Sequence, residues 1–126
     1  MKMGQYFLIV NLDKKEVINP RTFNDGLKLL EFGCSSHGTL TALSLLLRQS
    51  NEGGGGDFNE FENCQLVGSW AGDKIVIVGD YDESGLYDSA ETSFKDISED
   101  LIEQVTRFDK DLFRKLKTAS LFGKTE

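Results

Sequence analysis

The clearest chemical motif in the chain is an acidic stretch, Asp80–Glu91, with the sequence DYDESGLYDSAE. Oxygen-bearing side chains stand at positions 1, 3, 5, 9 and 12, and a glycine stands at position 6. This spacing resembles the calcium loop of EF-hand proteins, in which the glycine lets the backbone turn around the ion. The stretch therefore predicts a site for calcium or another cation, with five ligands: Asp80, Asp82, Ser84, Asp88 and Glu91.

The surroundings of this motif also fit a simpler interpretation. An EF-hand loop follows a helix, whereas the residues before Asp80 have the alternating pattern of a strand. The helix expected after the loop is weak, and a second such loop is missing. The alternative is a solvated acidic loop that joins a strand to a helix.

A second candidate is the stretch Gly33–Thr39, GCSSHGT, which precedes a leucine-rich helix. Small residues ahead of a helix expose backbone N–H groups, and the helix dipole there favours an anion. The predicted anion or ligand site consists of Ser35, Ser36, His37 and Thr39. The alternative is a connector between two helices, in which a Ser or Thr caps the second one and Cys34 is buried.

The same stretch contains Cys34 three residues before His37, the only histidine. A Cys–His pair is one arrangement for nucleophilic catalysis, provided that both side chains meet and a third group orients them. Together with Cys64 they supply three zinc ligands, but a fourth is not evident. No catalytic residue is assigned on this basis.

The charge of the chain is unevenly distributed. The formal net charge is −7, and residues 80–111 contain eleven acidic and three basic side chains, a local balance of −8. Phosphate backbones would be repelled by this half, so nucleic-acid binding is disfavoured. A basic partner or a cation is the natural complement.

The length of 126 residues suits one domain, which we expect to cover residues 1–117, with 118–126 as a frayed tail. The N-terminus lacks a secretory apolar segment, and no stretch is apolar enough to span a membrane. We therefore expect a cytoplasmic protein with no membrane partner, and with Cys34 and Cys64 as free thiols.

Alternating apolar residues predict the strands. Gln5–Asn11 and Glu16–Asn19 form one expected hairpin. Leu66–Trp70 and Lys74–Val78 form a second, and the β-branched residues on both sides of Lys74–Val78 indicate a central, covered strand.

Helical spacing predicts four further segments. The first is Gly26–Phe32, capped by Asn24 with Leu27 and Leu30 inward, and the second is Thr39–Gln49, with a buried stripe through Leu40, Leu43, Leu46 and Leu47. The third is a short turn of helix at Tyr87–Phe94, and the last starts near Ser98 with a stripe through Leu101, Val105, Phe108, Leu112 and Leu116. The expected fold class is α+β, a small antiparallel or mixed sheet built from two hairpins with three to four helices against it.

Three blocks, YFLIVNLDKKE, DGLKLLEFG and GSWAGDKIVIVGDYD, are similar to a group of small uncharacterised bacterial and phage-type proteins. This resemblance implies a compact single domain and no catalytic residue. We expect a non-enzymatic binding module, inhibitor- or immunity-like toward a basic protein partner, an analogy of charge and size only. The alternatives are calcium or other cation binding through Asp80–Glu91, and a Cys/His enzyme that acts on an anionic substrate at Gly33–Thr39.

Overall fold

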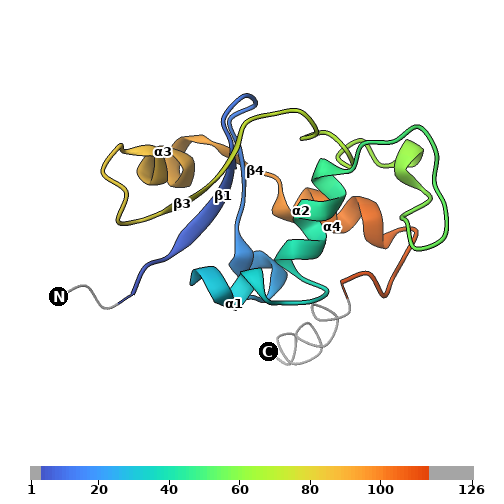
Figure 1. The fold of residues 1–126 in the computed structure, drawn as a ribbon, viewed down its shortest axis with the longest axis horizontal. Coiled ribbons are helices and arrows are strands. Elements are labelled where there is room, and N and C mark those ends of the chain that lie inside the picture. Colours follow the sequence, from blue (N-terminus) through green and yellow to red (C-terminus); the bar gives the residue numbers. More distant parts are fainter. Residues whose placement is uncertain (1–3, 114–126) are drawn as a thin grey trace.

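The computed structural model describes residues 4–113 (Figure 1). The expected domain end at residue 117, the tail 118–126 and Leu116 lie outside the described residues. Within residues 4–113 the fold is a four-stranded mixed sheet with four α-helices, which confirms the small α+β class.

The sheet has the strand order β3-β1-β2-β4. Strand β1 (Phe7–Asn11) pairs antiparallel with both β2 (Glu16–Ile18) and β3 (Ile75–Gly79). The two-residue strand β4 (Lys95–Asp96) runs parallel to β2. The predicted N-terminal hairpin is therefore confirmed, and β1 is the central strand.

The four helices are α1 (Leu29–Gly33), α2 (Thr39–Leu47), α3 (Leu86–Ser93) and α4 (Ser98–Thr106). Two single 3-10 turns are also present, η1 (Pro20–Phe23) and η2 (Phe61–Asn63).

Each face of the sheet has its own apolar core, because successive residues of β1 point to opposite faces. Ile9 packs with residues of α2 and α4 and with Trp70 in the larger core. Leu8 and Val10 pack in a smaller core that Ala90 of α3 closes. Figure 1 shows the consequence: α3 lies on one side of the strands, and α2 and α4 lie on the other.

The second predicted hairpin is wrong. Leu66–Trp70 forms consecutive turns rather than a strand, and β3 pairs with β1 at the edge of the sheet. The reason is Trp70, whose buried side chain belongs to the larger core. The backbone nitrogens of Gly68 and Trp70 donate to the carbonyl oxygens of Leu45 and Leu46, so this segment pairs with the end of α2.

The first predicted helix begins too early and has the wrong inner face. Asn24 has a φ of 60° and ends η1, so it does not cap α1, which starts at Leu29. Phe32 is the buried residue of α1, whereas Leu30 is 72% exposed. Phe32 of this short helix packs against Phe7 of β1, and the centroids of the two rings are 6.5 Å apart in an edge arrangement.

Helices α2 and α4 begin where the sequence predicts, but the residues that they bury are only partly the predicted ones. Helix α2 ends at Leu47, and it buries Thr39, Ala42, Leu45 and Leu46 while Leu40 is 48% exposed. Helix α4 begins at Ser98 and buries Leu101 and Val105 as predicted. It ends at Thr106, so Phe108 lies beyond the helix and is exposed.

Candidate functional site

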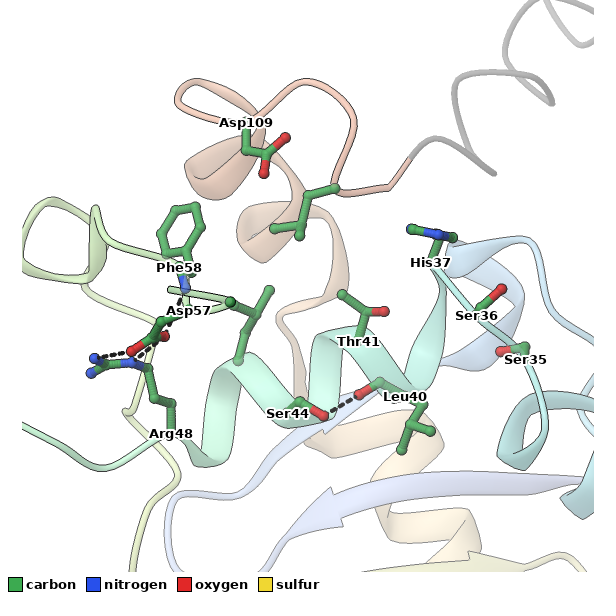
Figure 2. Close-up of a pocket in the computed structure, with 13 residues that line it drawn as sticks. Ser35, Ser36, His37, Leu40, Thr41, Ser44, Arg48, Asp57, Phe58 and Asp109 are labelled. Carbon is green, nitrogen blue, oxygen red and sulfur yellow. Dashed lines mark hydrogen bonds and ion pairs between the residues drawn. The ribbon is translucent and has the colours of Figure 1, made fainter. Parts of the chain in front are cut away.

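A groove of about 690 Å³ lies along the outer side of α2 (Figure 2). One wall comes from α2 itself, through Leu40, Thr41, Ser44 and Arg48, and from the preceding residues Ser35, Ser36 and His37. The opposite side comes from loop residues 56–58 and from Asp109 and Leu112, which follow α4. Apolar side chains and hydroxyl groups thus share one concave surface.

The start of α2 is already occupied by a carboxylate of the chain itself. Oδ2 of Asp25 accepts hydrogen bonds from the backbone nitrogen of Thr39 at 2.8 Å, from its Oγ1 at 2.6 Å and from Oγ of Ser35 at 3.0 Å. Asp25 is only 7% exposed. It supplies the negative charge that the helix N-terminus favours, which an external anion was expected to provide.

The local backbone is shaped to admit this carboxylate. A Cβ atom on Gly38 would lie 2.5 Å from Oδ2 of Asp25, so any larger residue would push the carboxylate away. His37, just before it, has a φ of 58°, in the left-handed region. The GCSSHGT stretch connects α1 to α2, but the residue that caps α2 is Asp25 rather than a Ser or Thr of the stretch, and Cys34 is exposed rather than buried.

Arg48 fixes the far end of the groove. Its Nε and Nη2 atoms donate to the two carboxylate oxygens of Asp57 at 2.8 and 2.6 Å, a bidentate pair that Figure 2 shows at the end of α2. Nη2 also donates to the Glu52 carbonyl, and the guanidinium lies 3.8 Å from the centroid of the Phe61 ring. The hydrogen bonds to Arg48 hold the pKa of Asp57 below its usual range. Arg48 thus connects the glycine-rich loop, residues 52–57, to the end of α2, and the positive charge of Arg48 is already paired with Asp57.

The residues of the predicted anion site separate in the structure. Ser35, Ser36 and His37 line the groove, whereas Thr39 is buried and bound to Asp25. Cys34 is an exposed free thiol and does not belong to the groove lining.

The three-ligand zinc hypothesis is wrong for the described residues. Cys64 is a buried free thiol in the larger core, and its Sγ lies 3.4 Å from the carbonyl oxygen of Gln104. Burial, and then the charge of Glu60, raise its pKa. Within residues 4–113, no three His, Cys, Asp or Glu side chains are arranged to hold a metal ion.

The acidic stretch from Asp80 to Glu91 has local roles in the fold. Asp80 accepts a hydrogen bond from the backbone nitrogen of Tyr6 at 3.0 Å, and Asp82 accepts from the backbone and hydroxyl of Ser84. Helix α3 already begins at the seventh residue of the stretch, which places Asp88 and Glu91 on the helix. This arrangement matches a solvated loop that joins a strand to a helix.

All eleven acidic side chains of residues 80–111 are exposed. Those of residues 80–91 lie with α3 on one side of the sheet, and Glu99, Asp100 and Glu103 belong to α4 on the other. Glu99 and Asp100 stand in the first turn of α4, where the helix dipole favours negative charge. The acidic segment, residues 80–111, is thus divided between two surfaces.

The sequence reasoning missed Asp25, Arg48, Asp57 and Asp109 as parts of this region. Asp25 and Thr39 are fourteen residues apart, and Asp109 reaches the groove only through the packing of α4, so no short spacing reveals either. For Arg48 and Asp57 the sequence shows an arginine at the end of the leucine-rich helix and an aspartate after the glycine run, and this spacing does not by itself indicate a bidentate pair.

No helix within residues 4–113 combines the length and the apolar character that crossing a membrane requires. No protein-family model, curated protein or solved structure matches this chain. The resemblance to small bacterial and phage-type proteins therefore stays a prediction.

Proposed function

We propose that this protein is a binding module that holds a basic, partly apolar segment of a partner protein in the groove along α2. The observation that supports this proposal is the composition of the groove. It combines the exposed side chain of Leu40 and the hydroxyl groups of Thr41 and Ser44 with the exposed carboxylate of Asp109, while its Arg48 is paired within the chain.

The charge of the whole protein favours a basic partner. The net charge is −7, and every carboxylate of residues 80–111 faces solvent. Such a field attracts a basic protein before contact and raises the association rate, whereas the contacts in the groove set the lifetime of the complex. This division of roles is what an inhibitor- or immunity-like module requires.

An anionic substrate at the start of α2 is less well supported. Asp25 holds the position that such a substrate would take, and its carboxylate would repel a second negative group. The groove therefore favours a ligand with apolar and cationic groups.

The test begins with quantitative capture of partners by the full chain from cells that express it, at low and at moderate salt. A captured basic protein is then purified, and its association and dissociation rates are measured against the wild type and two variants. Leu40→Lys places a positive charge in the groove, where it repels a basic segment, and Leu30→Lys places the same charge on an exposed site of α1 outside it.

We expect Leu40→Lys to speed dissociation at least about tenfold, the effect of roughly 1.4 kcal/mol, and Leu30→Lys to leave it unchanged. The association rate should fall steeply with salt in all three proteins. Binding that is indifferent to Leu40→Lys, or a partner whose association does not respond to salt, would contradict the proposal.

A further inference from the structure

Strand β3 has one free side among the described residues. It is the first strand in the order β3-β1-β2-β4, so β1 covers one of its sides and no strand within residues 4–113 covers the other. An uncovered strand presents unpaired backbone N–H and C=O groups, which readily pair with another chain.

The hydrogen-bond pattern identifies the residues that face this free side. The backbone nitrogen of Leu12 donates to the carbonyl of Lys74, and that of Asp80 donates to the carbonyl of Tyr6. Lys74 and Asp80 therefore mark hydrogen-bonded pairs with β1, and in an antiparallel ladder such pairs alternate along the strand. The residues between them, Ile75, Ile77 and Gly79, direct their backbone groups away from β1, and of these groups the Gly79 carbonyl already accepts a hydrogen bond from the Asp82 nitrogen.

The free side carries little to discourage pairing. Residues 75–79, IVIVG, contain no proline, no charge and no bulge, the features by which proteins protect such edges. Ile77 is 43% exposed, and Ile75 and Val76 are half-buried. Charged residues stand only at the two ends, Lys74 before the strand and Asp80 after it.

We propose that a second copy of this chain pairs with β3 in antiparallel orientation, with Ile77 opposite Ile77 of the other copy. In this register Lys74 of each copy lies opposite Asp80 of the other, and Val76 lies opposite Val78. These complementary charges favour a second copy of the chain as the partner of β3, because a two-fold axis through Ile77 places each Lys74 opposite an Asp80. The two sheets then join into one of eight strands.

The neighbouring registers are less favourable. The free side requires that Ile75, Ile77 or Gly79 pair with one another, so the register can slip only in steps of two residues. A slip in one direction places Lys74 opposite Val78, and a slip in the other places Val76 opposite Asp80. Either one leaves a charge against an aliphatic side chain. Only the central register pairs the two Lys–Asp sets at non-hydrogen-bonded positions, where opposed side chains are closest.

This interface is distinct from the groove along α2, so the dimer and the proposed partner binding fail or succeed independently. Sedimentation velocity of the full chain over a wide concentration range measures the dimer. The variants are Lys74→Glu, which sets two carboxylates against each other at both ends, and Lys74→Glu combined with Asp80→Lys, which restores opposite charges. Because Asp80→Lys also removes the acceptor of the Tyr6 nitrogen, the melting temperature of each variant is measured alongside. Lys95→Glu, an exposed lysine on β4 at the opposite edge, is the matched control.

We expect Lys74→Glu to raise the dimer dissociation constant about tenfold, since two attractive pairs become repulsive. The double exchange should restore it, and Lys95→Glu should leave it unchanged. A wild type that is monomeric at every concentration overturns the proposal. So does an equal effect of Lys95→Glu, or a double exchange that folds normally and does not restore pairing.

Cysteine cross-linking tests the register without charge changes, in a Cys34→Ser background that removes the exposed native thiol. Facing residues of a hydrogen-bonded antiparallel pair have Cα atoms about 5.5 Å apart, within the range of a disulfide. Ile77→Cys should therefore oxidise to a covalent dimer. Ile75→Cys should not, because its two copies are displaced by four residues, about 13 Å. Equal cross-linking of both, or preference for Ile75→Cys, contradicts the register.

Discussion

The Asp25 carboxylate lies at the N-terminus of α2, the position where the sequence predicts an external anion. The helix N-terminus and the small residues before it are what an anion site needs, and these the sequence shows. It does not show that a carboxylate fourteen residues earlier reaches the same N–H group. Long-range contacts of this kind depend on the path of the chain through η1 and α1.

Removing this carboxylate should destabilise the fold. In Asp25→Ala the backbone nitrogen and hydroxyl of Thr39 lose their acceptor in a buried place, which we expect to cost about 2–3 kcal/mol. Urea unfolding followed by circular dichroism measures it. Asp88→Ala removes an exposed carboxylate from the first turn of α3 and should stay within about 1 kcal/mol of wild type. Equal losses would show that Asp25 has no special structural role.

The two thiols should differ sharply in reactivity. Cys34 is exposed, whereas Cys64 is buried and its pKa is raised by burial, so less of it is thiolate at any given pH. Iodoacetamide should modify one thiol per native chain and two after unfolding, with peptide mass spectrometry assigning the native adduct to Cys34. Native modification of Cys64 at a comparable rate would contradict the burial.

At the scale of elements, local patterns predicted where strands and helices begin more reliably than what they pair with. The alternation in Lys74–Val78 correctly indicated a strand, but the prediction that this strand is central is wrong, because β3 lies at the edge of the sheet. Its partner is β1, more than sixty residues away. The apolar segment Leu66–Trp70 was assigned to a hairpin because it stands next to that strand. The burial of Trp70, and its Nε1 hydrogen bond to Glu16 at 2.8 Å, hold the segment against α2 and β2 instead.

Two adjacent residues of the edge strand β3, Ile77 and Val78, differ in burial. Val78 is buried in the core beneath α3, whereas Ile77 faces the other side and is 43% exposed. Val78→Asp should prevent cooperative folding, because an unpaired carboxylate in the core can cost more than the roughly 5–15 kcal/mol of total stability. Ile77→Asp should melt cooperatively near the wild type when both are measured at a concentration at which the chain is monomeric, so that any loss of pairing at β3 does not enter. Thermal melts by circular dichroism decide, and a folded Val78→Asp protein would show that this core is open.

At the scale of the molecule, the sequence located the acidic segment, residues 80–111, but not its division between two surfaces. Helix α4 and the Asp80–Asp82 loop both belong to this segment, but the helix does not lie with the loop on one side of the sheet. It packs instead against the larger core with α2, and the loop and α3 accompany the smaller core on the other side. Because residue spacing says nothing about the face of the sheet a helix covers, this division could not be predicted.

The same division bears on the predicted cation site. Asp88 and Glu91 belong to α3, Asp80 is bound to Tyr6, and Asp82 is bound to Ser84, so the five proposed ligands serve separate local structures. Calcium needs six to eight oxygens around one point, whereas magnesium demands a smaller octahedral site. A calcium-specific site should therefore respond to calcium far more than to magnesium at the same concentration. Simple screening of the negative charges should respond equally to both ions.

We expect calcium and magnesium to raise the melting temperature equally, as screening of a net charge of −7 requires. Differential scanning fluorimetry of the full chain measures this. The variant Asp82→Asn with Glu91→Gln alters the predicted ligands, and Glu52→Gln with Glu62→Gln removes two exposed charges elsewhere. Both should lower the response to either ion by the same small amount, since they remove equal charge. An additional rise with calcium, lost only in the first variant, would instead establish a cation site in Asp80–Glu91.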